Sequence, residues 1–468
     1  MEKKTAWEKY SEEEKERVFA FAEEYRKFLS ANKTERECAA AFRKMAEENG
    51  FRSLDDVLAS GEKLEPGDRV YADNKGKNMA LFIIGKQPVE KGMNILGAHI
   101  DSPRLDLKQH PLYESTGMAL LDTHYYGGIK KYQWVTLPLA LHGVFVKKDG
   151  TAVPVRIGDD PGDPVFGVSD LLIHLAGTQM EKKGTKVVEG EDLNVLAGSI
   201  PLKKEEGDSA GSGEGKERVK AAVLQILEEK YGVGEDDFVS AEIEVVPAGE
   251  AKDYGFDRSM IMGYGHDDRV CAYPSFAAML KAGVPERTSA CLLVDKEEIG
   301  SVGATGMQSR FFENVTAEVM NACGEGGELA LRRALQNSRA LSSDVSAAYD
   351  PNFPNVMEKN NSAYFGQGVV FNKYTGSRGK SGSNDASAEY VALIRDIMDR
   401  GNVTYQTAEL GKVDQGGGGT IAYILGNYNM QVIDSGVAVL NMHAPWEIIS
   451  KADLYEAKRC YEAFLARP

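Results

Sequence analysis

Histidine and acidic side chains stand where several apolar, strand-like stretches of this sequence end. His99, for example, follows the run NILGA, while Glu297 and Glu298 follow ACLLVDK. Because functional groups of open α/β sheets collect at the carboxyl ends of strands, we expect these side chains to share one crevice. In chain order, the candidates are His99, Asp101, Asp267, Asp268, Glu297, Glu298, Asp344 and His443.

Two imidazoles and several carboxylates form a suitable ligand set for a pair of divalent metal ions. If Asp267, Glu298 and Asp344 bind as anions, these three carboxylates and one hydroxide would balance the charge of two such ions. Two ions about 3.5–4 Å apart polarise a carbonyl group and lower the pKa of a shared water. The residue types therefore predict metal-assisted hydrolysis.

The adjacent glutamates fit this chemistry because neighbours in a turn after a strand can both reach one site. One of Glu297 and Glu298 could bind metal while the other stays free as a general base near the attacking water. In the sequence HID, Asp101 lies two residues after His99 and can accept the other ring N–H of that histidine. The pattern HxD alone is a weak signal.

The elements that must position these residues are an α/β framework. Ser11 with Glu14, and Thr34 with Glu37, are capping boxes that predict two N-terminal helices. From about residue 251 onward strands alternate with helices, including the strand SACLLV (289–294), which implies a layered sheet with parallel pairs. Ser450, with Asp453 three residues on, predicts the start of a final helix.

The composition limits the partners. The 468 residues contain 55 Lys and Arg against 71 Asp and Glu, and the net charge of −16 disfavours nucleic acid and anionic membranes. The sequence shows neither a signal peptide nor a stretch of about 20 apolar residues that would span a bilayer. Five scattered cysteines without a CxxC pair predict reduced thiols. We therefore expect a cytoplasmic protein.

Five motifs in the order GAHIDSPRLDLK, GHDDRVCAYPS, DKEEIGS, SSDVSAAYDP and NMHAPWE resemble the M18 aminopeptidase family of dinuclear zinc peptidases, of the bacterial type. The resemblance covers nearly the whole chain. It implies that Asp267 bridges two ions, that His99 and Asp344 complete one, and that Glu298 and His443 complete the other. It also implies that Glu297 is the general base and that Asp101 orients His99. Asp268 departs from the asparagine that relatives often carry.

The resemblance further implies a zinc-exopeptidase-like, three-layer α/β catalytic domain with a mixed sheet and an inserted β-rich dimerisation domain. The 167 residues between His99 and Asp267 are too many for an ordinary loop. We therefore expect the insertion at residues 108–250 and the catalytic domain at 1–107 and 251–468. Family members form tetrahedral dodecamers, and His174 resembles a histidine delivered into a neighbouring subunit's active site, against its plain interpretation as a histidine on an apolar segment.

The function predicted is removal of N-terminal residues from peptides with a free N-terminus, with two divalent ions per chain. Zn²⁺ is the expected metal, with Co²⁺ and Mn²⁺ as alternatives. A carboxypeptidase or amide deacylase on the same metal core, and an inactive assembled scaffold, are the competing hypotheses. Acidic and neutral N-terminal residues stay open as the preferred substrates.

Two further regions have open interpretations. Lys373, Arg378 and Lys380 either bind an acidic substrate side chain or form a solvated basic loop. Residues Gly417 to Thr420, within DQGGGGTIA, either contact the substrate through backbone N–H groups or form a plain strand-to-helix turn.

Overall fold

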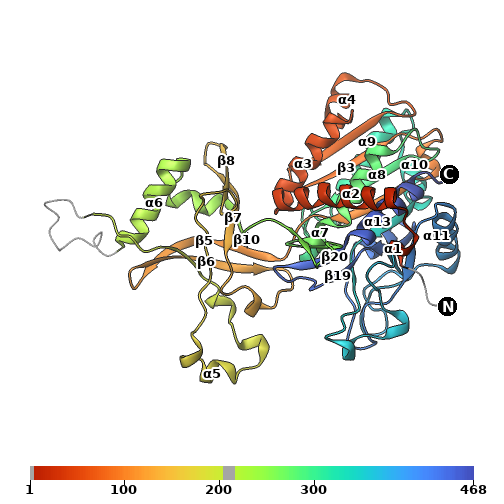
Figure 1. The fold of residues 1–468 in the computed structure, drawn as a ribbon. Coiled ribbons are helices and arrows are strands. Elements are labelled where there is room, and N and C mark those ends of the chain that lie inside the picture. Colours follow the sequence, from red (N-terminus) through yellow and green to blue (C-terminus); the bar gives the residue numbers. More distant parts are fainter. Residues whose placement is uncertain (1–4, 204–216) are drawn as a thin grey trace. The chain divides into compact units, whose positions relative to one another are not determined.

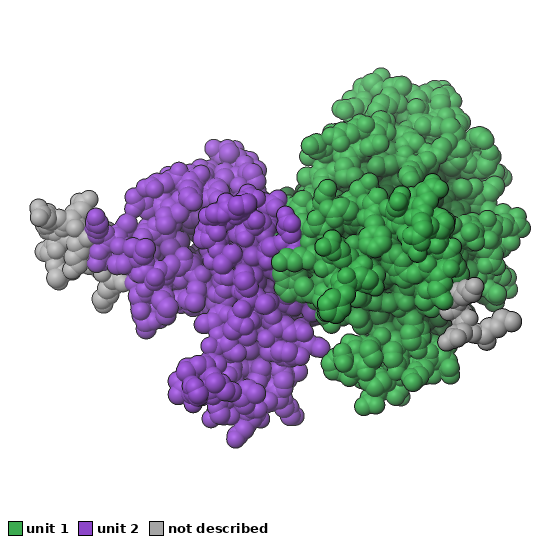
Figure 2. Space-filling view, viewed as in Figure 1, with its two compact units in different colours: residues 1–102, 251–442, 446–468 green, residues 103–250, 443–445 purple. Residues whose placement is uncertain are grey.

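The computed structural model describes residues 5–203 and 217–468, so the polar, Gly-rich stretch at 204–216 lies outside the described residues. The chain divides into two compact units (Figure 2). The first contains residues 1–102, 251–442 and 446–468, and the second contains residues 103–250 with 443–445. The second unit begins at Pro103 rather than at residue 108 because its strand β5 (Arg104–Ser115) already starts there.

The first unit is built on a nine-stranded sheet in the order β1-β2-β3-β13-β4-β14-β18-β16-β17. The strands are β1 (Arg52–Ser53), β2 (Arg69–Asn74), β3 (Asn78–Ile83), β4 (Asn94–His99), β13 (Ser289–Val294), β14 (Arg339–Ser343), β16 (Val369–Asn372), β17 (Tyr405–Thr407) and β18 (Gln431–Gly436). The four central strands β13, β4, β14 and β18 are mutually parallel, while β3 and β16 pair antiparallel to this group. The sheet is therefore mixed, and its central carboxyl ends lie at one edge.

Helices cover both faces of this sheet (Figure 1). The helices of the unit are α1 (Ala6–Lys9), α2 (Glu12–Ala31), α3 (Glu35–Glu48), α4 (Leu54–Ser60), α7 (His266–Arg269), α8 (Ala272–Lys281), α9 (Phe311–Ala322), α10 (Glu328–Gln336), α11 (Ala388–Arg400), α12 (Ala422–Gly426) and α13 (Lys451–Leu465). Successive strand residues point to opposite faces, so Leu293 packs with α2, α3, α8 and α13 while Leu292 packs with α4, α9 and α12. This confirms the three-layer α/β fold.

The N-terminal capping boxes are confirmed. Ser11 and Thr34 cap α2 and α3, each accepting from the backbone N–H of the glutamate three residues on. Ser450 does stand at the start of α13, but its side chain makes no cap hydrogen bond. The carboxylate of Asp453 instead accepts the backbone N–H groups of Gly366 and Gly368, at 2.8 and 2.7 Å, and ties the helix to another loop.

A second, five-stranded sheet of the first unit has the order β11-β12-β20-β19-β15. Its strands are β11 (Lys252–Tyr254), β12 (Met260–Gly263), β15 (Ser346–Ala347), β19 (Ala438–Leu440) and β20 (Glu447–Ser450). Strand β12 leads directly into α7, and β15 follows Asp344. Two candidate site segments, α7 and the residues around Asp344, therefore adjoin strands of this sheet.

The second unit contains an antiparallel six-stranded sheet in the order β8-β7-β10-β5-β6-β9. Besides β5, its strands are β6 (Met118–Tyr126), β7 (Leu139–Val146), β8 (Ala152–Ile157), β9 (Val195–Gly198) and β10 (Ala241–Pro247), and its helices are α5 (Gly177–Met180) and α6 (Arg218–Tyr231). Its composition is accordingly β-rich. Across both units, none of the helices in the described residues is long and apolar enough to cross a membrane.

Candidate functional site

Most candidate residues of the first unit lie where three adjacent parallel strands end, while Asp267 and Asp268 lie on α7. His99 is the last residue of β4, Asp344 follows β14, and Glu297 and Glu298 form a 3₁₀ turn, η8 (Glu297–Ile299), shortly after β13. His99 is paired with Val294 of β13, so the histidine and the start of the glutamate turn share one level of the sheet. The register of the sheet therefore gathers these groups from distant parts of the sequence.

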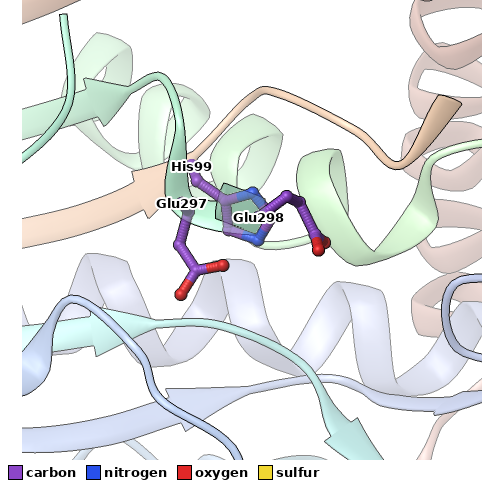
Figure 3. Close-up of side chains that lie close together, drawn as sticks. All are labelled: His99, Glu297 and Glu298. Carbon is purple, nitrogen blue, oxygen red and sulfur yellow. The ribbon is translucent and has the colours of Figure 1, made fainter. Parts of the chain in front are cut away.

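His99 stands at the centre of the group. Its Nε2 atom lies 3.5 Å from Asp344 Oδ1 and 3.9 Å from Asp267 Oδ1. Ligand atoms of His99, Asp267 and Asp344 all lie within 4.8 Å of one another, and so do those of His99, Glu297 and Glu298. Figure 3 shows the two glutamate side chains diverging around the His99 ring, so that neighbouring residues direct their carboxylates to different places.

The other side of the His99 ring faces two aspartates. Its Nδ1 atom lies 3.2 Å from the carbonyl oxygen of Asp101, 3.5 Å from Asp101 Oδ1 and 3.6 Å from Asp268 Oδ1. Burial lowers the pKa of His99, but the charge of Asp344 and hydrogen bonds to Asp101 and Asp344 outweigh it and raise the pKa well above its ordinary value. The imidazole is thus oriented by negative groups on both sides.

Asp101 also holds the glutamate turn, a role that the sequence did not reveal. Its Oδ1 accepts the backbone N–H of Glu297 at 3.0 Å, and its Oδ2 accepts that of Glu298 at 3.2 Å. The preceding residue, Lys296, adopts the left-handed conformation at φ 68°. Successive N–H groups after a left-handed residue form a concave anion site, and here the anion is a side chain of the protein. Asp101 therefore fixes both glutamates through their backbone.

Two carboxylates of the cluster, those of Glu297 and Asp344, resist ionisation. Burial, followed by the charges of Asp344, Asp101 and Asp267, raises the pKa of Glu297 to about 8 even though His99 acts in the opposite direction. Burial likewise raises the pKa of Asp344, with repulsion from Asp267 adding to it. Crowded carboxylates beside an imidazole would be stabilised as anions by a divalent cation, and N and O donors suit zinc. The residues present therefore fit a metal site.

Asp268 lies next to the buried guanidinium group of Arg269. Its Oδ2 lies 3.8 Å from Arg269 Nη1, and the arginine is held by the carbonyl oxygen of Lys33 at 2.6 Å and by Cys38 Sγ at 3.2 Å. Burial raises the pKa of Asp268 to about 7, against the lowering effect of His99 and Arg269. Asp268 thus links His99 to Arg269 through a chain of ionisable side chains.

The two remaining candidates belong to the second unit. His443 lies in the short segment 443–445, and its Nδ1 is 2.9 Å from the carbonyl oxygen of Gly128. That contact leaves Nε2 as the ring nitrogen suited to a metal. His174 lies in a 3₁₀ turn, η3 (Ile173–Leu175), and is exposed.

The sequence left two regions open, the basic loop with Lys373 and Lys380 and the glycine-rich residues 417–420, and residues of both form hydrogen bonds within the chain. Asp385 accepts hydrogen bonds from Lys373 and, at 3.0 Å, from Lys380, so both ammonium groups already have a carboxylate partner within the chain. In the glycine-rich segment, the Gly418 N–H donates to Thr375 at 3.1 Å, and Thr420 Oγ1 donates to Asp434 Oδ1 at 2.6 Å. These contacts favour the interpretation of this segment as a packed turn ahead of α12.

A protein-family model and a known relative match nearly the whole length of this chain. Residues 28–465 match the model of a family described as aminopeptidase I zinc metalloprotease (M18). A probable M18 family aminopeptidase 1 of Clostridium acetobutylicum is 64% identical over 464 residues, which cover 99% of this chain and 98% of the relative.

Solved structures of similar proteins have the same fold as this chain. The crystal structure of an M18 family aminopeptidase from Thermotoga maritima has a TM-score of 0.93 at 44% identity, with 100% of both chains covered. A solved Saccharomyces cerevisiae mApe1 dodecamer is more distant, with a TM-score of 0.75 at 21% identity over 95% of this chain and 96% of that chain. The fold is common to all of these proteins.

Proposed function

The chain belongs to the M18 family of aminopeptidases and is a metal-dependent aminopeptidase, and from this premise we propose how its residues divide the reaction. Two divalent ions, Zn²⁺ in the first place, would be held by a set of five side chains. They are His99, Asp267, Glu298, Asp344 and His443. The cluster around His99 supports four of these assignments, and the hydrogen bond that His443 donates to the Gly128 carbonyl supports the fifth.

When bound, the metal ions polarise the scissile carbonyl and lower the pKa of the attacking water. Glu297 accepts the proton of that water and then delivers it to the nitrogen of the departing amine, so the glutamate ends the cycle as it began. Asp101 keeps Glu297 and Glu298 in place by accepting their backbone N–H groups. Asp101 is thus assigned to positioning. The resemblance to the family assigns His174 to the completion of the site.

One observation carries this division of labour: the two glutamates direct their carboxylates to different places around His99, while Asp101 fixes both through their backbone N–H groups. A general base must lie within reach of the proton that it accepts. The divergence of the two side chains therefore allows Glu298 to bind metal and leaves Glu297 for proton transfer.

The test compares Glu297→Gln with Glu298→Gln in the metal-loaded protein. We expect Glu297→Gln to lower turnover by roughly 100-fold or more with metal content unchanged, because it removes only proton transfer. Glu298→Gln should lower the metal content, since it replaces a ligand. Metal is measured by elemental analysis and turnover with aminoacyl reporters. Full turnover of Glu297→Gln would refute the role of Glu297.

We further propose that the chain assembles as a homo-oligomer, with the dodecamer as the expected form. The Saccharomyces cerevisiae mApe1 dodecamer supports this state, and so do the exposed apolar residues Leu172, Ile173 and Leu175 beside His174. In such an assembly the second unit would serve as the dimerisation domain, and His174 would reach a neighbouring subunit's site. Five free cysteines support a reducing, cytoplasmic location.

A further inference from the structure

The loop that carries both glutamates is closed at its base by Thr305. The loop leaves β13 at Asp295 and returns at Gly306, and these two residues form an isolated parallel bridge. Thr305 Oγ1 donates a hydrogen bond of 2.5 Å to Asp295 Oδ2, and the Asp295 N–H donates to the Thr305 carbonyl at 3.4 Å. Both side chains are buried. A side-chain bond thus reinforces the backbone closure.

Between these ends the backbone is held in a costly conformation. Lys296, Gly300, Ser301 and Gly303 all have positive φ angles, of 68°, 93°, 60° and 120°. For lysine and serine the left-handed region costs about 1–3 kcal/mol, and such residues persist only where their surroundings hold them. The contacts at the base of the loop must therefore offset the strain of the turn that directs Glu297.

Both sequence neighbours of Lys296 are held by hydrogen bonds. On one side Asp295 is held by Thr305, and on the other Glu297 is held through its N–H by Asp101. The aliphatic part of Lys296 packs close to Gly303, while its Nζ lies 3.3 Å from Asp295 Oδ2. Without the threonine hydroxyl, the Asp295 carboxylate keeps this ammonium group as a partner and would draw the lysine toward itself. The left-handed turn would then shift.

We propose that Thr305 is a positioning residue for the aminopeptidase reaction. By holding Asp295, it maintains the turn at Lys296 and hence the direction of the Glu297 carboxylate. The inference rests on the proposed role of Glu297 as the general base. A misplacement of about 1 Å at a reacting group can lower a rate by about 100-fold, so a residue without contact to substrate can control turnover.

The test is Thr305→Val in the full-length, metal-loaded protein, because valine keeps the volume and removes the hydroxyl. We expect kcat to fall roughly 10- to 100-fold while KM and metal content stay within about twofold of wild type. Thr305→Ser should restore most of kcat, since serine supplies the same donor. If the valine variant does not fold, Thr305→Ala removes the hydroxyl without the added methyl contacts and is measured in the same way.

Thr316→Val is the matched control. Thr316 is a buried threonine of α9 whose Oγ1 donates to the Phe312 carbonyl at 2.8 Å within its own helix. Its replacement should leave kcat near wild type. The inference is overturned if Thr305→Val keeps wild-type kcat, if Thr316→Val lowers kcat equally, if Thr305→Ser fails to restore it, or if metal is lost in step with turnover.

Glu297→Gln, measured beside these variants, distinguishes a failure of the proposed function from a failure of the inference about Thr305. If Glu297→Gln keeps its turnover, the proposed function of Glu297 fails and the inference fails with it. If Glu297→Gln is inactive while Thr305→Val is fully active, only the inference about Thr305 fails.

Discussion

At the scale of single residues, Asp268 adds a negative charge beside His99 and receives compensation from Arg269 on its other side. Asp268→Asn keeps the shape and removes that charge. We expect metal to bind about fivefold more weakly, because a charge at this range contributes about 1 kcal/mol to cation binding in a partly screened site. Competition with a chelating dye measures the affinity. Unchanged or tighter binding would contradict this electrostatic account.

Sequence alone predicted which residues would meet, but not how they are held. Residue type and position at strand ends predicted the group of His99, Asp267 and Asp344, and the structure brings these together. The same reasoning missed the hydrogen bonds that the two glutamate N–H groups donate to Asp101 and the one that Thr305 donates to Asp295. The two contacts of Asp101 depend on the left-handed φ of Lys296, which is not apparent from residue type.

At the scale of elements, strand β18 passes so close to Asp344 that only glycine fits at one position. A Cβ atom added at Gly436 would lie 1.8 Å from the carbonyl oxygen of Asp344. Gly436→Ala should displace Asp344, destabilise the fold by about 1–3 kcal/mol and lower metal content. Gly283→Ala is the control, since a Cβ there meets nothing within 4 Å. Equal melting temperatures and metal contents for the two variants would argue against this packing constraint.

Helices α2 and α7 are joined by a buried histidine. His266 Nδ1 lies 2.9 Å from the hydroxyl of Tyr25, and burial, aided by the charge of Arg269, lowers the pKa of His266 from 6.5 to about 3. Below pH 6.5 the unfolded chain therefore binds a proton that the folded chain does not. The stability contributed by this group is present above pH 6.5 and is lost as the pH falls toward 3.

We predict that lowering the pH from 7 to 4.5 costs the wild type about 2–3 kcal/mol more than it costs His266→Asn, which has no titrating group at this position. Denaturant unfolding of chelator-treated protein measures the difference without a contribution from metal release. His124→Asn, which replaces an exposed histidine, should behave as wild type. Parallel pH profiles for wild type and His266→Asn would disprove the assignment.

Apolar runs and capping motifs in the sequence predicted individual strands and helices well. The strand expected at residues 289–294 is β13, with the same bounds, and the capping boxes of α2 and α3 form as expected. The start of α13 shows the limit of such reasoning, because Asp453 bonds to Gly366 and Gly368 instead of closing a box with Ser450. A carboxylate can accept hydrogen bonds from backbone N–H groups that are distant in the sequence, and a capping motif does not reveal those donors.

At the scale of the whole molecule, exposed apolar side chains predict where assembly would be sensitive. Ile173 is 71% exposed beside His174. Ile173→Asp should reduce the particle mass measured by light scattering, because a charge would be buried in the interface. Leu329→Asp, at a position of α10 that is 60% exposed, is the control and should leave the mass unchanged. An unchanged mass for Ile173→Asp would exclude this segment from the interface.

The strand order of the large sheet has a consequence for biosynthesis. Strands β3 and β4 emerge from the ribosome early, but β13, which lies between them, is made almost two hundred residues later. At about 5–20 residues per second, β3 and β4 wait about 10–40 seconds for β13 while residues 103–250 of the second unit are synthesised. During that interval two apolar strands lack their common neighbour and are open to wrong pairing. The sheet can therefore close between β3 and β4 only after residue 294 has been made.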